Sequence, residues 1–347
     1  MKKYWMLLLI GIIPFGLNSC GDDDDEGGAS GTEADAGAIT ADDGIKYYIT
    51  GVDWMRFDYD SDWLLTGWGD DDYYYWDVSY DPLYMEGHCL EYEDSEETTI
   101  FSNFSINSSG YVTQFTIPYS YSDDEYSESG TTTCNLTYNS SGQLTKIVSS
   151  GSYKATEDGY TYTESGSSTY TLTWSGNVIT SWTESDSGSG SYGYEWSYSA
   201  SGTFDYGDYE YANSLKQYTM STAEWFWGDY SALAFLGYFG VGPSYLPVKM
   251  SCEEEETETY DDETDTYDYS DTESYSYGFN DNGTINWENW GGYMVYYTYS
   301  DGSSTSSSAK ARQVESASTT RSSANGRHNL FSRKSGLRDR ARMASGM

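Results

Sequence analysis

The thiol of Cys20 is the first group in the chain with a defined chemistry, because it ends the tetrapeptide Leu17-Asn18-Ser19-Cys20. An aliphatic residue, two tolerant positions and a Cys form a bacterial lipobox, whose thiol takes a diacylglycerol as a thioether. Two lysines and a short apolar stretch precede it, as is typical of a secretion leader. We therefore expect residues 1–19 to be a signal peptide and Cys20 to carry the lipid that attaches the chain to a membrane. The alternative is a soluble secreted protein in which this Cys is coincidental.

An acidic run follows the lipobox directly and consists of Asp22, Asp23, Asp24, Asp25 and Glu26. It resembles the surface-export signal of Bacteroidota lipoproteins. That resemblance implies an outer-membrane lipoprotein that is lipid-anchored and exposed on the cell surface. The alternative is a solvated acidic run with no export role. In both cases the Gly-, Ala- and Asp-rich composition of residues 20–44 predicts a flexible tether.

Three further cysteines, Cys89, Cys134 and Cys252, could remain free thiols or form one disulfide. Cys134 and Cys252 lie in predicted strands and would be the first pair to join, but we favour three buried free thiols over a disulfide. His88 precedes Cys89, but neighbours on a strand point to opposite faces, so these side chains are poorly placed for a nucleophile–base pair. The chain has 2 His and no C-x-x-C motif, and we expect no metal and no cofactor.

Carboxylates are abundant, since the chain has 56 Asp and Glu. A hydrolase that uses a carboxylate pair needs the two groups about 5–10 Å apart in a cleft, and no spacing in the sequence singles out a pair. Asp58-Tyr59-Asp60-Ser61-Asp62 has the opening of a calcium loop, but Trp63 replaces the required Gly and Gly69 replaces the final Glu. We therefore predict no catalytic residues and no enzyme activity, and a carboxylate-dependent hydrolase is the alternative.

Large aromatic residues crowd a short acidic stretch early in the mature chain. Sugar rings stack on Trp and Tyr faces while carboxylates accept hydrogen bonds from sugar hydroxyls. The candidate residues for ligand stacking are therefore Trp54, Trp63, Trp68, Tyr73, Tyr75 and Trp76. For most of these rings we favour the other interpretation, that they form the core, because aliphatic residues are scarce and 38 Tyr and 12 Trp take their place.

The elements that position these residues should be strands, because Tyr and Trp favour strands. Residues 160–164 and 170–174 alternate between large side chains and Thr, which predicts a half-buried strand with a Thr face in water. Residues 253–277 predict a hairpin with long acidic arms. The net charge of -39 argues against nucleic acid as a partner, and the mean hydropathy of -0.68 argues against a bundle of membrane helices.

A turn pattern recurs along the chain: an apolar residue, Asn or Ser, two small polar residues, Gly, any residue and an apolar residue. The Gly can take a positive φ after a type I turn and so close a short hairpin. Copies begin at Ile106, Tyr138, Tyr198 and Phe279, and a shortened copy spans 174–178. One amphipathic helix is predicted over about 221–237, because Ser221-Thr222-Ala223-Glu224 is a capping box and Gly237 or Gly240 can end the helix.

These elements predict an antiparallel β domain over 45–300. The segment 301–347 differs, because it holds nine of the 17 basic residues and three of the 56 acidic residues. Its Ser-rich, non-periodic sequence predicts a basic disordered tail. One interpretation is that this tail docks on the acidic domain or on anionic lipopolysaccharide. The other is that it is simply solvated.

The leader, the Asn/Ser-x-x-Gly hairpins and the late helix followed by Gly237-Tyr238-Phe239-Gly240 and Leu246-Pro247 resemble a known family. It comprises Bacteroidota lipoproteins of unknown function described as having a porin-like fold. The resemblance covers about residues 101–299. It implies a mainly β fold, in which a large antiparallel meander forms a curved sheet or incomplete barrel with a helix packed on it. It carries no catalytic assignment.

These observations favour a cell-surface-anchored, non-enzymatic binding module, with a glycan or a host polymer as its ligand. The alternative is a structural or accessory envelope protein that docks to a partner protein. The aromatic stretch favours the first function, whereas the acidic hairpin and the basic tail favour the second.

Overall fold

The computed structural model describes residues 37–53, 55–70, 74–80, 83–89, 96–122, 126–157, 160–227, 231–260 and 263–301. Several predicted features lie outside these residues: the signal peptide, Cys20, the acidic run 22–26, Trp54, Tyr73 and the tail after Asp301. The side chains of His88 and Cys89 also lie outside the description, although their backbone forms part of a strand.

Strands dominate the described residues, with two short α-helices late in the chain. Their bounds are β1 (Ala38–Thr40), β2 (Lys46–Val52), β3 (Met55–Tyr59), β4 (Leu65–Asp70), β5 (Tyr74–Ser79), β6 (Tyr84–Cys89), β7 (Glu96–Ile106), β8 (Val112–Ser122), β9 (Tyr126–Tyr138), β10 (Leu144–Glu157), β11 (Tyr160–Ser175), β12 (Val178–Gly190), η2 (Ser191–Gly193), β13 (Glu195–Asp205), β14 (Tyr211–Ala212), α1 (Met220–Trp227), α2 (Ser231–Phe235), β15 (Tyr245–Leu246), β16 (Lys249–Tyr260), β17 (Glu263–Phe279), β18 (Ile285–Trp290) and β19 (Tyr293–Ser300).

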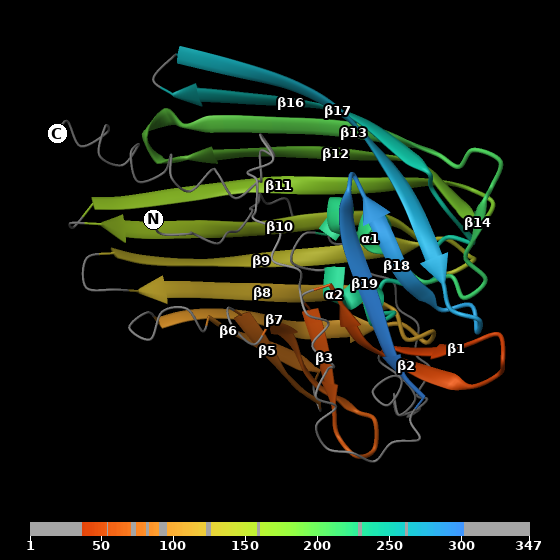
Figure 1. Cartoon of the computed structure of the whole chain (residues 1–347). Coiled ribbons are helices and arrows are strands. Elements are labelled where there is room, and N and C mark those ends of the chain that lie inside the picture. Colours follow the sequence, from red (N-terminus) through yellow and green to blue (C-terminus); the bar gives the residue numbers. More distant parts are fainter. Residues whose placement is uncertain are drawn as a thin grey trace, which may run out of the picture.

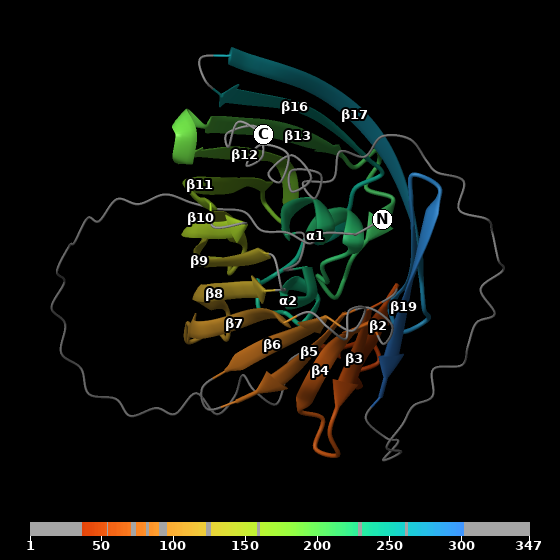
Figure 2. The same ribbon diagram turned by 90° about the vertical axis from the view of Figure 1, so that its left-hand side faces the viewer.

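Antiparallel pairing closes sixteen of these strands into a barrel (Figures 1 and 2). Neighbours in sequence pair from β2 to β13 and from β16 to β19, and β13 pairs with β16. The last strand then pairs with the second, with Thr298 opposite Gly51, so every strand of the ring has two partners. The antiparallel β class is therefore confirmed, but the prediction of a curved sheet or incomplete barrel is wrong, because the barrel is closed.

The predicted start of the domain at residue 45 is also too late. β1 lies within the segment 20–44 that the composition predicts as tether, and it pairs with β2 through Ile39 opposite Tyr47. In addition, the Gly37 N–H donates to the carbonyl of Leu236 at 3.1 Å. A Gly- and Ala-rich composition therefore does not prevent this stretch from joining the wall once a partner strand is present.

The wall is long on one side and short on the other. Strands β7 to β13, β16 and β17 have 11–17 residues, whereas the remaining strands of the ring have 5–8. Along β11 the side chains alternate as predicted: Tyr170 and Leu172 are buried inside, and Thr171 and Thr173 face outward. The same alternation on the neighbouring long strands gives the wall an inner face of rings and an outer face of hydroxyls.

The segment between β13 and β16, residues 206–248, folds into the ring, and we call it the plug. Figure 2 shows α1 and α2 inside the circle of strands. Every residue of α2 is buried, and Leu233, Phe239 and Leu246 of the plug pack in one core cluster with wall residues. The scarce aliphatic residues are thus concentrated where plug and wall meet, and aromatic rings supply the rest of the core.

The helical region differs in detail from the single helix predicted over 221–237. The described residues contain two helices, and the cap of α1 is Thr219, because its N–H donates to Thr222 Oγ1 at 2.9 Å. The predicted cap Ser221 lies inside the helix. The predicted end at Gly237 is confirmed: its φ is 81°, and Tyr238 N–H donates to the Leu233 carbonyl at 2.9 Å, which is a Schellman closure.

Four of the five predicted turns are confirmed. Gly110, Gly142 and Gly283 have positive φ and donate to the Asn three residues before each of them, and Gly176 lies in the turn between β11 and β12. The copy at 198–204 is wrong, because these residues continue β13. There the glycine serves packing, since a Cβ at Gly202 would lie 2.2 Å from the Trp182 indole nitrogen.

Candidate functional site

Two of the predicted stacking residues lie in the core. Trp68 of β4 and Trp76 of β5 are opposite each other in register, and each is 4% exposed. Their indoles stack with centroids 5.3 Å apart, and Trp76 also stacks on Phe101 at 4.4 Å. Both faces of the Trp76 ring are therefore occupied by protein, and neither indole offers an open face to a sugar.

Trp63 and Tyr75 keep partial exposure but have different neighbours. Trp63 lies between β3 and β4 with a φ of 61° and stacks on Tyr48 at 4.7 Å. The Tyr75 hydroxyl donates to Asp58 at 3.3 Å, and burial followed by this carboxylate raises the pKa of Tyr75 to about 12. The structure therefore does not gather the described members of the predicted stacking group into one platform.

Two carboxylates of the D-x-D-x-D stretch, Asp58 and Asp60, make contacts within the protein. Asp58 forms an ion pair with Arg56 at 3.2 Å. Asp60 accepts hydrogen bonds from the N–H groups of Asp62 and Leu64 at 2.8 and 3.0 Å, which closes the β3–β4 turn. Among the described residues, no group of three His, Cys, Asp or Glu is placed to hold a metal ion.

Cys134 and Cys252 are buried free thiols on β9 and β16, as favoured, and the candidate disulfide between them is absent. Burial, and then the charge of Glu254, raises the pKa of Cys252 to about 11. Such a thiol is a poor nucleophile at neutral pH, because the thiolate is the reactive form.

Inward-facing carboxylates on the long strands are held by aromatic donors. The Tyr119 and Tyr153 hydroxyls both donate to Glu128, the second at 2.6 Å. Glu164 accepts from the Trp196 indole N–H at 2.6 Å and from the Tyr162 hydroxyl at 3.0 Å. These contacts give Glu128 and Glu164 aromatic hydrogen-bond donors inside the wall, as buried carboxylates require.

Charge is segregated between the two faces of β9 to β12. The described acidic side chains on these strands, Glu128, Glu164, Glu184 and Asp186, all occupy inward positions. The outward positions from Ser127 to Ser189 carry Ser, Thr, one Asn, one Val and two lysines, and within the described residues they include no acid. This outer face is thus a hydroxyl-rich and weakly basic area on a chain of charge -39.

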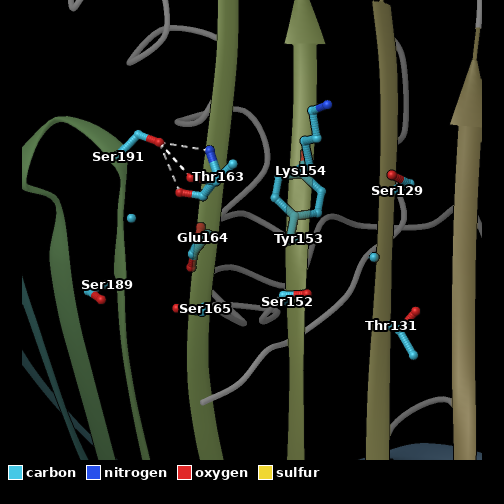
Figure 3. Close-up of a pocket in the computed structure, with 12 residues that line it drawn as sticks. Ser129, Thr131, Ser152, Tyr153, Lys154, Thr163, Glu164, Ser165, Ser189 and Ser191 are labelled. Atoms are coloured by element: carbon cyan, nitrogen blue, oxygen red, sulfur yellow. Dashed lines mark hydrogen bonds between the residues drawn. The ribbon is translucent and has the colours of Figure 1, made fainter. Parts of the chain in front are cut away.

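A hollow of about 620 Å³ lies on this outer face (Figure 3). Two rows of outward side chains line it, one from Ser129 through Lys154 and Thr163 to Ser191, the other from Thr131 to Ser189. The residues between the rows complete the lining: Gly130, Tyr153, Glu164 and Gly190. Lys154 is its one basic residue.

One corner of the hollow is fixed by hydrogen bonds. Ser191 Oγ accepts from the Thr163 N–H at 2.9 Å and lies 2.8 Å from Thr163 Oγ1 (Figure 3). Sequence reasoning assigned Thr163 to a water-facing row but did not find the hollow. The available signal was the absence of acids from alternate positions of four consecutive strands, which becomes visible only once their pairing is known.

Comparisons with known proteins add little to this geometry. No family model and no curated protein matches the chain. A similar solved structure is that of a porin-like protein from Bacteroides uniformis ATCC 8492, determined at 2.32 Å resolution. It has 12% sequence identity and a TM-score of 0.24, and the match covers 61% of this chain and 93% of that chain. A likeness at this level carries no argument about function.

The helices in the described part of the chain include none long and apolar enough to cross a membrane.

Proposed function

We propose that this protein is a lipid-anchored envelope protein, displayed at the cell surface, whose barrel is a non-enzymatic binding module for extracellular polymers, glycans first. The single observation that carries the proposal is the orientation of the long strands. Their hydroxyls point outward and their rings point inward, so the wall presents a water-compatible surface that is rich in hydrogen-bonding groups.

The outer face determines how such a barrel can be held at a membrane. A barrel embedded in a bilayer carries an apolar band on its outside. On β11 every outward position from Thr161 to Thr173 is Ser or Thr, while Tyr170 and Leu172 face inward. A wall of this kind is stable in water and needs a separate attachment to stay at a membrane. The lipidated Cys20, with a tether behind it, supplies that attachment.

The plug favours a binding module over an open channel through the barrel. α1 and α2 occupy the ring, and their buried residues belong to the same core as the wall. The barrel is then a solid support, and ligands are bound on its outside. The hydroxyl-lined hollow over β9 to β12 is the described feature best suited to a polyhydroxylated ligand.

A second function is favoured by one specific observation on the acidic hairpin. Tyr267 and Tyr269 of β17 are 59% and 41% exposed, and they lie opposite Glu256 and Glu254 of β16. Exposed Tyr residues are common anchors at protein interfaces. A structural or accessory role, in which this hairpin docks to a partner protein of the envelope, is therefore the alternative.

The attachment is tested by metabolic labelling with an alkynyl palmitate. The wild-type chain should be labelled and a Cys20→Ser variant should not, whereas an unlabelled wild type contradicts the proposal. Protease treatment of intact cells tests display. We expect wild type to be cleaved, and a variant with residues 22–26 changed to Ala to be protected. Protection of both would place the barrel inside the envelope and favour the accessory function.

A further inference from the structure

The hollow over β9 to β12 combines three properties that bear on its ligand. It is concave, its rim side chains are hydroxyls, and its one basic group is Lys154. In the described part of the chain Lys154 has no ion-pair partner, whereas Arg56 is paired with Asp58. An exposed ammonium among neutral hydroxyls is suited to a ligand that carries both an anionic group and many hydroxyls.

The surroundings of Lys154 sharpen this requirement. In register, Lys154 stands opposite Ser129 on one side and Thr163 on the other. The acids of these strands face inward, where aromatic donors hold Glu128 and Glu164. At an ionic strength of about 0.15 M charges are screened over roughly 8 Å, so distant charges of the chain count little inside the hollow, and its own charged lining residues are Lys154 on the outer face and Glu164 on the inward side.

The outer face also extends beyond the hollow in one direction along the strands, because Ser150 on β10 lies opposite Ser167 on β11. Outward Ser and Thr continue from Ser152 to Ser150 on β10 and from Ser165 to Thr173 on β11. Hydroxyl rows spaced about 4.8 Å apart between strands can accept and donate hydrogen bonds to several consecutive sugar units. A chain molecule therefore fits this surface better than a single sugar does.

We propose that the hollow binds a carboxylate-bearing sugar unit of an acidic polysaccharide. The Lys154 ammonium pairs with the carboxylate, and the hydroxyls of Ser129, Ser152 and Thr163 bond to the sugar hydroxyls. The Ser191–Thr163 contact holds one corner of the hollow in place before the ligand arrives, which lowers the entropy cost of binding. This inference rests on the proposed binding function and names its ligand class.

The experiment is calorimetric titration of the detergent-purified full chain at 0.15 M salt with two probes of equal length. One is a galacturonate oligosaccharide, which is acidic, and the other is its fully methyl-esterified form, which is neutral. The test variant is Lys154→Gln. The matched control is Lys146→Gln, because Lys146 lies on the same strand and the same outer face but outside the hollow. Both variants change the net charge by the same amount.

We expect wild type to bind the acidic oligosaccharide at least tenfold more tightly than the neutral one. Lys154→Gln should lose at least tenfold in affinity, and Lys146→Gln should stay within twofold of wild type. Ser152→Trp, which fills the hollow without changing charge, should also abolish binding. Equal losses in the two lysine variants, or equal affinity for the two probes, would overturn the inference.

Other occupants of this face give distinct results. If light scattering shows a dimer that Ser152→Trp converts to a monomer, the face joins two copies of the chain and the inference is wrong. If neither probe binds the hollow but other glycans bind the intact protein, the inference fails while the proposed binding function stands. If no polymer binds at all and the protein is still labelled at Cys20, the binding function itself fails.

Discussion

The Glu288 carboxylate of β18 accepts a hydrogen bond of 2.9 Å from the backbone N–H of Ser221 in the first turn of α1. Its other oxygen accepts from the Tyr297 hydroxyl at 2.8 Å, and that hydroxyl accepts from the Met220 N–H at 2.9 Å. The first turn of a helix leaves N–H groups without helical partners. Here the barrel wall satisfies two of them, so this contact fastens the plug to the wall.

Replacing Glu288 with Ala should destabilise the barrel by about 2–4 kcal/mol, because it leaves Ser221 N–H and the Tyr297 hydroxyl buried without their acceptor. Urea unfolding followed by Trp fluorescence measures the loss. Glu255→Ala, on the exposed outer side of β16, should change stability by less than about 0.5 kcal/mol. Equal effects of the two substitutions would show that the plug is not held through Glu288.

Gly202→Ala should destabilise the protein by about 1–3 kcal/mol, since the new Cβ would lie 2.2 Å from the Trp182 indole nitrogen. Trp182 is 2% exposed and its N–H lies 3.4 Å from the Met250 sulfur, so the ring has little room to move. Ser201→Ala on the outer face is the matched control. Thermal unfolding should separate the two variants, and coincident curves would argue against this packing.

Gly202 also lies in the stretch where the sequence-based prediction of a turn was wrong. The stretch 198–204 has the composition of a turn, and sequence alone does not reveal that an indole on the adjacent strand needs the space of the missing side chain. The alternation in β11 succeeded because one strand contains all the information about its two faces. The Schellman end at Gly237 succeeded for the same local reason.

Closure of the ring could not be predicted, because it depends on pairings between distant segments such as Thr298 with Gly51. The position of the helices inside the wall also depends on that closure. The prediction for Trp68 and Trp76 failed to distinguish ligand stacking from core packing, since both uses need the same residue type near strands. The hollow was missed because curvature across four strands is absent from any one of them.

Cys134 and Cys252 should react slowly with Ellman's reagent in the folded protein. The pKa of Cys252 is raised to about 11, so only roughly one thiol in a thousand is ionised at pH 8. In a Cys89→Ser variant, whose remaining unlipidated thiols are these two, we expect slow labelling at pH 8 and rapid labelling of both in 6 M guanidinium. Rapid labelling of the native protein would contradict the burial of both thiols.

Alkaline pH should unfold the barrel cooperatively. Burial, and then the Glu288 carboxylate, raises the pKa of Tyr277 and Tyr297 well above 10. A pKa that is higher in the folded state means that the folded state holds the proton more tightly. The free energy of unfolding should therefore fall as the pH rises above about 10.

Absorbance at 295 nm during a pH titration checks this, with circular dichroism followed in parallel. We expect a first group of tyrosines to ionise without loss of structure. The buried tyrosines should ionise only together with unfolding. Ionisation of all tyrosines near pH 10 with an intact fold would contradict the account.

The central claim is that the barrel stands in water and that Cys20 alone holds it at the membrane. The most direct test places the chain from Gly21 onward behind a cleavable secretion leader and fractionates the cells without detergent. We predict a folded barrel in the soluble fraction, whereas wild type stays with the membrane. Retention of the unlipidated barrel in the membrane fraction after a high-salt wash, which releases ionic contacts, would contradict the claim, since the outward Ser and Thr of β11 form no apolar band that a bilayer could hold.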